Sequence, residues 1–122
     1  MDPNRKIRLE SAGMDVDDAL KRVMGSEALL EKLLTRFLAD KNYPELLEGL
    51  GERDRVKAFT ASHTLKGICG NLSMTELYGL FSEQVEALRS EDFDKADGLM
   101  EKISPAFENI TAAIGGSVDE EK

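Results

Sequence analysis

The residues best suited to chemistry lie in one stretch of this 122-residue chain, Ala58 to Met74, which holds the only histidine and the only cysteine. A neutral imidazole such as that of His63 is a good nucleophile near pH 7, because much of it is unprotonated there. One helical turn further on, Lys66 offers a positive charge to phosphoryl oxygens. The face around the histidine carries no carboxylate to act as a base and no second metal ligand, so other catalytic groups would have to come from a partner.

Helical periodicity divides this stretch into two faces. At about 100° per residue, one face forms an apolar stripe suited to a core. That stripe contains Ala58, Ala61, Ser62, Leu65, Ile68, Cys69 and Leu72. The opposite face contains His63 with Val56, Phe59, Lys66, Gly67, Gly70 and Met74. Because Cys69 lies about 120° from His63 on this wheel, we expect a small core residue and no Cys–His nucleophilic pair.

Two glycines flank the histidine, although glycine inside a helix costs about 1 kcal/mol relative to alanine. Gly67 and Gly70 would either let a partner approach the imidazole closely or let a neighbouring helix pack closely. We favour clearance for a partner, because both glycines lie opposite the apolar stripe.

The segment from His63 to Gly67, followed by Gly70-Asn71-Leu72, resembles the signature of histidine-containing phosphotransfer (HPt) domains of bacterial multistep phosphorelays. The family pattern is His-x-Leu-Lys-Gly on an exposed helix face, with small residues downstream. The chain departs from it at Ser73, where the family often has glycine. The resemblance covers roughly residues 14–115.

This resemblance implies that His63 is the phosphoacceptor and that Lys66 stabilises the phosphoryl group. Gly67 and Gly70 would provide clearance, and Phe59, Asn71 and Met74 would contribute to docking. The implied partners are response-regulator receiver domains and a hybrid histidine kinase. The chain itself would need no cofactor, because Mg²⁺ is expected in the partner receiver domain.

Composition narrows the alternatives. With 16 Lys and Arg against 24 Asp and Glu, the net charge is −8, which argues against nucleic-acid binding through phosphates. A single cysteine excludes an internal disulfide and fits a cytoplasmic location. No apolar run approaches transmembrane length, so we expect no membrane association.

Capping residues and apolar spacing predict where the helices lie. Asp15, Ser26 and Asp54 are natural caps for a short helix, a longer helix to about residue 41, and the central helix. Pro44 is suited to the first position of another short helix. Ser73 and Glu76 have the spacing of a capping box, which predicts the start of the next helix. A last helix ends near residue 115, with a kink expected at Pro105.

These elements predict an all-α protein, an antiparallel up-down four-helix bundle with a short additional N-terminal helix. We expect a flexible leader at residues 1–13, an HPt-like bundle domain at 14–115, and a disordered acidic tail at 116–122. The leader and tail favour a free-standing protein. A monomer is expected, because no heptad seam remains once the bundle core is filled.

Three functions of different classes fit these observations. The first is a phosphorelay carrier, in which His63 accepts a phosphoryl group from one receiver aspartate and passes it to another receiver. The second is a binding module of the same fold that regulates a signalling partner without phosphotransfer. The third, an enzyme, is disfavoured because the chain has no catalytic triad, no paired Glu-x-x-His motifs and no ATP-dependent kinase motif. Intact His63, Lys66 and Gly67 favour the first.

Overall fold

The chain folds entirely into helices in the computed structural model, which describes residues 1–115. Those residues form seven helices and no strand, which confirms the predicted all-α class. In chain order the helices are α1 (Pro3–Ser11), α2 (Val16–Arg22), α3 (Glu27–Leu38), α4 (Asn42–Gly51), α5 (Arg55–Asn71), α6 (Thr75–Arg89) and α7 (Phe93–Gly115). The acidic tail expected at 116–122 lies outside the described residues.

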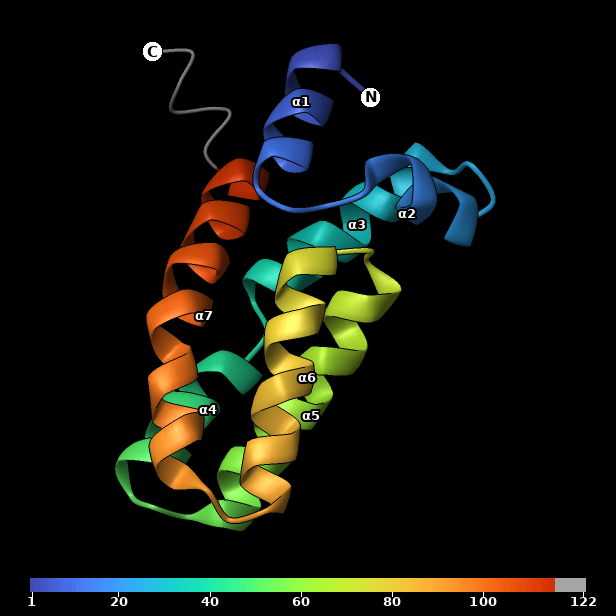
Figure 1. Ribbon diagram of the computed structural model, residues 1–122. Helices are drawn as coiled ribbons and strands as arrows, with labels where there is room; N and C mark the ends of the chain where they lie inside the picture. The colour runs from blue at the N-terminus through green and yellow to red at the C-terminus, as the bar shows by residue number, and fades with distance from the viewer. Residues whose placement is uncertain (116–122) are drawn as a thin grey trace.

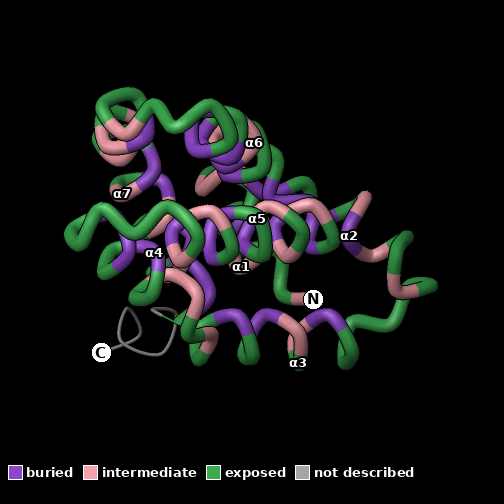
Figure 2. Tube along the Cα trace, turned by 90° about the horizontal axis from the view of Figure 1, so that it is seen from below, coloured by how far each residue is buried: buried purple, intermediate pink, exposed green. Residues whose placement is uncertain are grey.

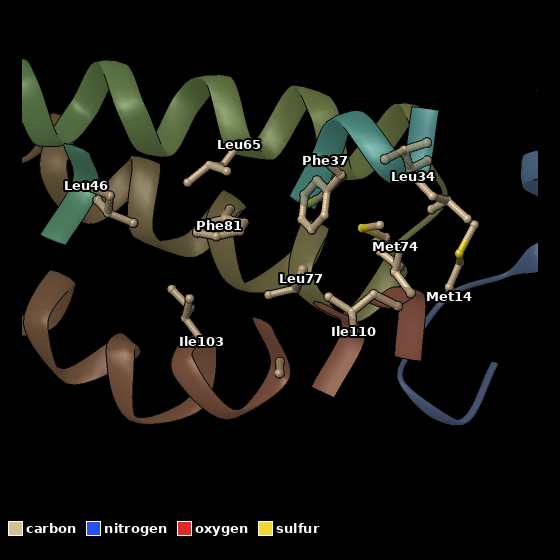
Figure 3. Packing of buried hydrophobic residues seen from close by; sticks show 14 of the residues in the cluster. Met14, Leu34, Phe37, Leu46, Leu65, Met74, Leu77, Phe81, Ile103 and Ile110 are labelled. Carbon is tan, nitrogen blue, oxygen red and sulfur yellow. The ribbon is translucent and has the colours of Figure 1, made fainter. Parts of the chain in front are cut away.

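The three longest helices, α5, α6 and α7, run up, down and up beside one another (Figure 1). Helix α5 packs between α4 and α6, while α7 packs on α6 and also touches α3 and α4. Buried and exposed residues alternate along these helices, as the apolar spacing predicts (Figure 2). The apolar faces of α3 to α7 meet in one core (Figure 3).

One polar contact crosses this core. The hydroxyl of Ser62 on α5 donates a hydrogen bond of 2.9 Å to Oε1 of Gln84 on α6. The amide nitrogen of Gln84 in turn donates to the carbonyl of Ala96 on α7, at 3.0 Å. Both polar side chains are fully buried, so these bonds satisfy groups that would be costly to leave unpaired. They also fix the relative positions of the three longest helices.

The three predicted aspartate and serine caps are confirmed. Asp15, Ser26 and Asp54 each accept a hydrogen bond from the backbone N–H three residues later, at 3.0 to 3.1 Å. Each side chain satisfies one of the four N–H groups that lack a partner at a helix start. The residue at which α5 begins is thereby set locally.

The capping box expected at Ser73 is wrong. Helix α6 begins after Met74, which makes no side-chain cap, and Ser73 is a turn residue with a φ of +55°. The Ser73 hydroxyl instead donates to Asp18 on α2 at 2.6 Å. The Ser73 hydroxyl, which the local pattern predicts to cap a helix, is therefore used in a contact with another helix.

The flexible leader expected at residues 1–13 is also wrong, since most of it forms α1. Pro3 begins this helix, and the Asp2 carboxylate accepts from the N–H of Asn4 at 3.1 Å. Leu9 is its one fully buried residue. The polar composition of this segment, with Pro3 and Gly13 near its ends, favours a flexible leader, although Pro3 is well suited to the first turn of a helix.

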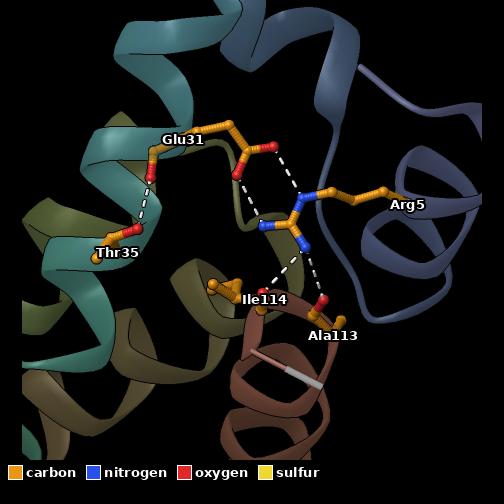
Figure 4. Close-up of polar contacts among 5 residues, drawn as sticks. All are labelled: Arg5, Glu31, Thr35, Ala113 and Ile114. Carbon is orange, nitrogen blue, oxygen red and sulfur yellow. Dashed lines mark hydrogen bonds and ion pairs between the residues drawn. The ribbon is translucent and has the colours of Figure 1, made fainter. Parts of the chain in front are cut away.

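Arg5 anchors α1 to two other helices (Figure 4). Its guanidinium donates two bonds of 2.8 Å to the carboxylate of Glu31 on α3. It also donates to the carbonyls of Ile114 at 2.9 Å and Ala113 at 3.4 Å, in the last turn of α7. The Glu31 carboxylate raises the pKa of Arg5 above its ordinary value. A cation placed at the carbonyl end of a helix is favoured by the helix dipole.

Of the two prolines assigned to helices, Pro105 lies inside the last helix as predicted, whereas Pro44 is displaced from the expected first position. Helix α4 begins at Asn42, so Pro44 is its third residue and not its first. Pro105 lies inside α7, which continues as one helix from Phe93 to Gly115. The first turn of a helix and its solvent side are where a missing N–H is best tolerated, and both prolines are exposed.

Candidate functional site

His63 is exposed on α5 and points away from the core. The stripe on the opposite side of the helix is buried, as predicted, at Ala58, Ala61, Leu65 and Cys69. Because these four residues face α4 and α6, the helix must present His63 on its remaining side. The periodicity of the sequence thus placed the imidazole on the correct face.

The imidazole borders an open groove of about 530 Å³ that lies over the C-terminal half of α5. Helix α5 contributes His63, Lys66, Gly67 and Gly70 to its walls. Helix α2 and helix α6 add side chains from the two sides. These are Asp18 and Arg22 from α2, and Tyr78 from α6. Lys66 thus brings a positive charge to the groove that His63 borders, whereas Arg22 lies there together with Asp18, its ion-pair partner.

The two glycines beside the histidine differ in their surroundings. A Cβ atom built on Gly67 would meet no atom within 4 Å, so the space beside the imidazole is open there. A Cβ on Gly70 would lie 3.1 Å from two ring carbons of Tyr78. Gly70 therefore accommodates a neighbouring side chain of α6, and the expectation of free clearance is wrong at that position.

Aromatic and cationic side chains continue this face toward the start of α5. The Phe59 ring is stacked near the imidazole of His63, with centroids 5.8 Å apart and planes at 25°. The guanidinium of Arg89, from the end of α6, lies 5.3 Å from the Phe59 ring centre. Val56, one turn earlier, is 68% exposed. Val56 and Phe59 form the apolar part of the surface next to His63, which is where docking is expected.

Met74 does not belong to this surface, contrary to expectation. It is 1% exposed and packs in the core (Figure 3). Helix α5 ends at Asn71, and the turn at Ser73 then reverses the chain. The helical wheel therefore stops applying before residue 74. Asn71 itself is exposed and lines the groove, as expected for a residue near the site.

Hydrogen bonds among Asp18, Arg22 and Ser73 hold α2 beside the groove. One carboxylate oxygen of Asp18 accepts from the Ser73 hydroxyl at 2.6 Å and from Nε of Arg22 at 3.0 Å. The Ser73 hydroxyl first, and then Arg22, hold the pKa of the Asp18 carboxyl below its ordinary value. In addition, the backbone N–H of Asp15 donates to the carbonyl of Ser73 at 2.8 Å. These bonds join α2 to the turn that follows the histidine helix.

Sequence reasoning missed Asp18, Arg22, Tyr78 and Arg89. The i,i+4 spacing of Asp18 and Arg22 signals an ion pair on a helix, but nothing local places that pair beside His63. Tyr78 and Arg89 reach the site only because α6 packs antiparallel to α5. Tertiary contacts alone bring these residues together.

Two side chains that line the groove, His63 and Cys69, are candidate nucleophiles. Burial raises the pKa of the Cys69 thiol to about 12, so the thiolate is not available there. Among the residues that the structure describes, no three His, Cys, Asp or Glu side chains gather to hold a metal ion. The exposed nucleophile of the groove is thus the His63 imidazole, and Lys66 lines the same groove.

Comparisons with protein-family models, curated proteins and solved structures give no match to this chain. Within residues 1–115, no helix has the length and apolar character that crossing a membrane requires.

Proposed function

We propose that this chain is an HPt phosphocarrier of a multistep phosphorelay. The observation that carries the proposal is the set formed by the exposed His63, Lys66 one turn along and the open position at Gly67. The imidazole has room for a phosphoryl group and for the partner that delivers it. The chain as a whole has a net charge of −8, so the Lys66 cation in this groove is a local exception, suited to a phosphoryl group.

In the proposed reaction, His63 exchanges a phosphoryl group with a receiver-domain aspartate. The unprotonated ring nitrogen supplies the electron pair of the new N–P bond. The P–O bond to the aspartate breaks, and its electrons remain on the carboxylate. Lys66 stabilises the negative charge on the phosphoryl oxygens while the phosphoryl group passes between His63 and the aspartate. The receiver binds the Mg²⁺. The reverse sequence delivers the group to a second receiver.

The proposal includes the architecture that the family implies, an antiparallel four-helix bundle. Its four helices would be α3, α5, α6 and α7. The shorter α4, which follows α3 in the chain, would lie on the same side of the bundle as α3. The contacts of α7 with α3, α4 and α6, and of α5 with α4 and α6, support this grouping. The short α2 would cover the end of the bundle nearest the histidine, in keeping with its position along the groove.

The direct test is phosphotransfer from a panel of receiver domains encoded in the same genome. Each receiver is phosphorylated with labelled phosphate by its kinase, and this chain is then added. We expect acid-labile, alkali-stable label on the parent chain and at least about a hundredfold less on His63→Gln. Since His63 is exposed, the variant should keep its free energy of unfolding within about 0.5 kcal/mol.

Two outcomes would contradict the phosphocarrier. Equal labelling of the parent and His63→Gln would place the phosphate elsewhere. Stoichiometric binding of receivers without any transfer would instead support the binding module of the same fold, which regulates its partner by contact alone.

A further inference from the structure

We infer that Tyr78 is a positioning residue, whose ring holds the Lys66 ammonium beside His63 in readiness for the phosphoryl group. The inference rests on the proposed function, because it assigns Tyr78 a role in that transfer. Its physical core, an ordered lysine on an aromatic ring, can be tested separately.

The ring of Tyr78 is placed by a contact that involves no other functional side chain. Helices α5 and α6 pack antiparallel, and Tyr78 lies in the first turn of α6. Two of its ring carbons lie 3.1 Å from the position where a Cβ of Gly70 would stand. Any larger residue at position 70 would push the ring away from α5. The glycine thus provides a seat for the ring.

The seated ring lies beneath the end of the Lys66 side chain. The Lys66 ammonium nitrogen is 6.0 Å from the ring centre, at the outer limit of a cation–π interaction. No carboxylate is paired with Lys66 among the ion pairs of the described residues, so the ring is the contact that orients the ammonium. A lysine without such a contact samples many rotamers in water.

The ring leaves the ammonium available for a ligand. A paired carboxylate would compete with the phosphoryl oxygens for the same charge, whereas an aromatic face attracts the cation without neutralising it. Both Lys66 and Tyr78 line the groove that His63 borders. Tyr78 is 43% exposed, so its ring is accessible from the groove. Positioning of this kind reduces the reorganisation required at the moment of transfer.

The first measurement is NMR of the Lys66 ε-methylene protons, which needs no receiver and no phosphate. A ring current should shift these protons upfield in the parent and in Tyr78→Phe, which keeps the ring. Tyr78→Leu and Gly70→Ala should move the shift toward the value of an unstructured lysine. Gly67→Ala is the matched control, because no atom lies near that position, and it should leave the shift unchanged. An unstructured value in the parent overturns the inference.

The second measurement is a double-mutant cycle on the rate of transfer from a receiver. Tyr78→Leu should slow transfer about two- to fivefold, the factor that corresponds to an exposed cation–π contact, and Tyr78→Phe should restore it. In the Lys66→Ala background the same change should have no further effect. An undiminished effect there would mean that Tyr78 contacts the receiver directly, which overturns the positioning role.

The two measurements separate this inference from the proposed function. If the parent carries no phosphohistidine, the phosphocarrier fails, although the ring shift can still be present. If the parent transfers normally and Tyr78→Leu changes neither the shift nor the rate, the positioning role fails alone.

Discussion

At the scale of single residues, Cys69 illustrates how burial sets chemical reactivity on the histidine helix. His63 and Cys69 are six positions apart on α5 and both line the groove, yet one is exposed and the other fully buried. Desolvation raises the pKa of the Cys69 thiol from 9.0 to about 12, because a thiolate would lose its hydration in the core. The thiol is therefore inert, whereas the imidazole is exposed in the same groove.

We expect Cys69 to make stability fall with rising pH above the ordinary thiol pKa. Between pH 9 and 12 the unfolded chain has lost the thiol proton while the folded chain retains it. The free energy of unfolding should then decrease by up to about 1.4 kcal/mol per pH unit. Urea denaturation at pH 8, 9.5 and 11 measures this slope, and Cys69→Ala, which has no thiol, should show a shallower one.

A thiol reagent gives an independent check at pH 8. The folded protein should react with it at least about a hundredfold more slowly than the urea-unfolded protein, because only the thiolate reacts and it is suppressed by burial. Equal rates in the two states would show that Cys69 is accessible.

At the scale of elements, the two faces of α5 differ. One face is packed in the core, and the face that carries His63 is open beside the imidazole. Its apolar side packs on α4 and α6, while Gly67 leaves open space next to the imidazole. The helix loses stability there, since glycine is about 1 kcal/mol less favourable than alanine in a helix interior. Gly79 and Gly98 are equally open, and Gly67 differs from both in lining the groove that His63 borders.

We expect Gly67→Gln to block transfer from a receiver almost completely while the helix becomes slightly more stable. The long side chain would occupy the space that the receiver needs around His63. Gly98→Gln on α7 is the matched control, because Gly98 is equally open and does not line the groove. It should gain a similar stability, up to about 1 kcal/mol, without any effect on transfer. Phosphohistidine assays and urea denaturation measure the two properties.

A small phosphodonor separates steric exclusion from chemical damage. If phosphoramidate labels the parent, it should also label Gly67→Gln, because it requires no docked protein surface. Normal transfer from a receiver to Gly67→Gln would refute the clearance argument, and a loss of stability would instead indicate helix packing at this position.

At the scale of the whole molecule, the N-terminal segment completes the fold. Helix α1 buries Leu9 and uses Arg5 to join Glu31 on α3 with the carbonyl end of α7 (Figure 4). The following segment is bonded to the turn after the histidine helix, through the bonds of Asp15 and Asp18 to Ser73. Residues 1–22 therefore hold one end of the molecule together and set one wall of the groove.

We expect Leu9→Ala to lower the free energy of unfolding by about 2–4 kcal/mol, since it removes a fully buried leucine. Ile7→Ala is the matched control from the same helix, because Ile7 is 59% exposed. It should change stability by no more than about 0.5 kcal/mol. Urea denaturation followed by circular dichroism compares the two variants. Equal, small effects would mean that α1 does not contribute to the core.

Features that depend on residues close together in the chain could be predicted from the sequence. The caps at Asp15, Ser26 and Asp54 act on an N–H three residues away, so their helix starts could be predicted. The exposed face of α5 likewise follows from a periodicity that needs only the helix itself. That local information placed His63, Lys66 and Gly67 together before any tertiary contact was known.

The side chains that surround this face are brought to it by contacts between helices, which the sequence does not reveal. Ser73 bonds to Asp18, 55 residues earlier, and this bond overrides the local capping pattern. Gly70 is explained by the ring of Tyr78 on the next helix, and Met74 is buried because the chain turns before it. Each of these outcomes depends on how two helices pack, and the spacing of residues within one helix carries no information about its neighbour's side chains.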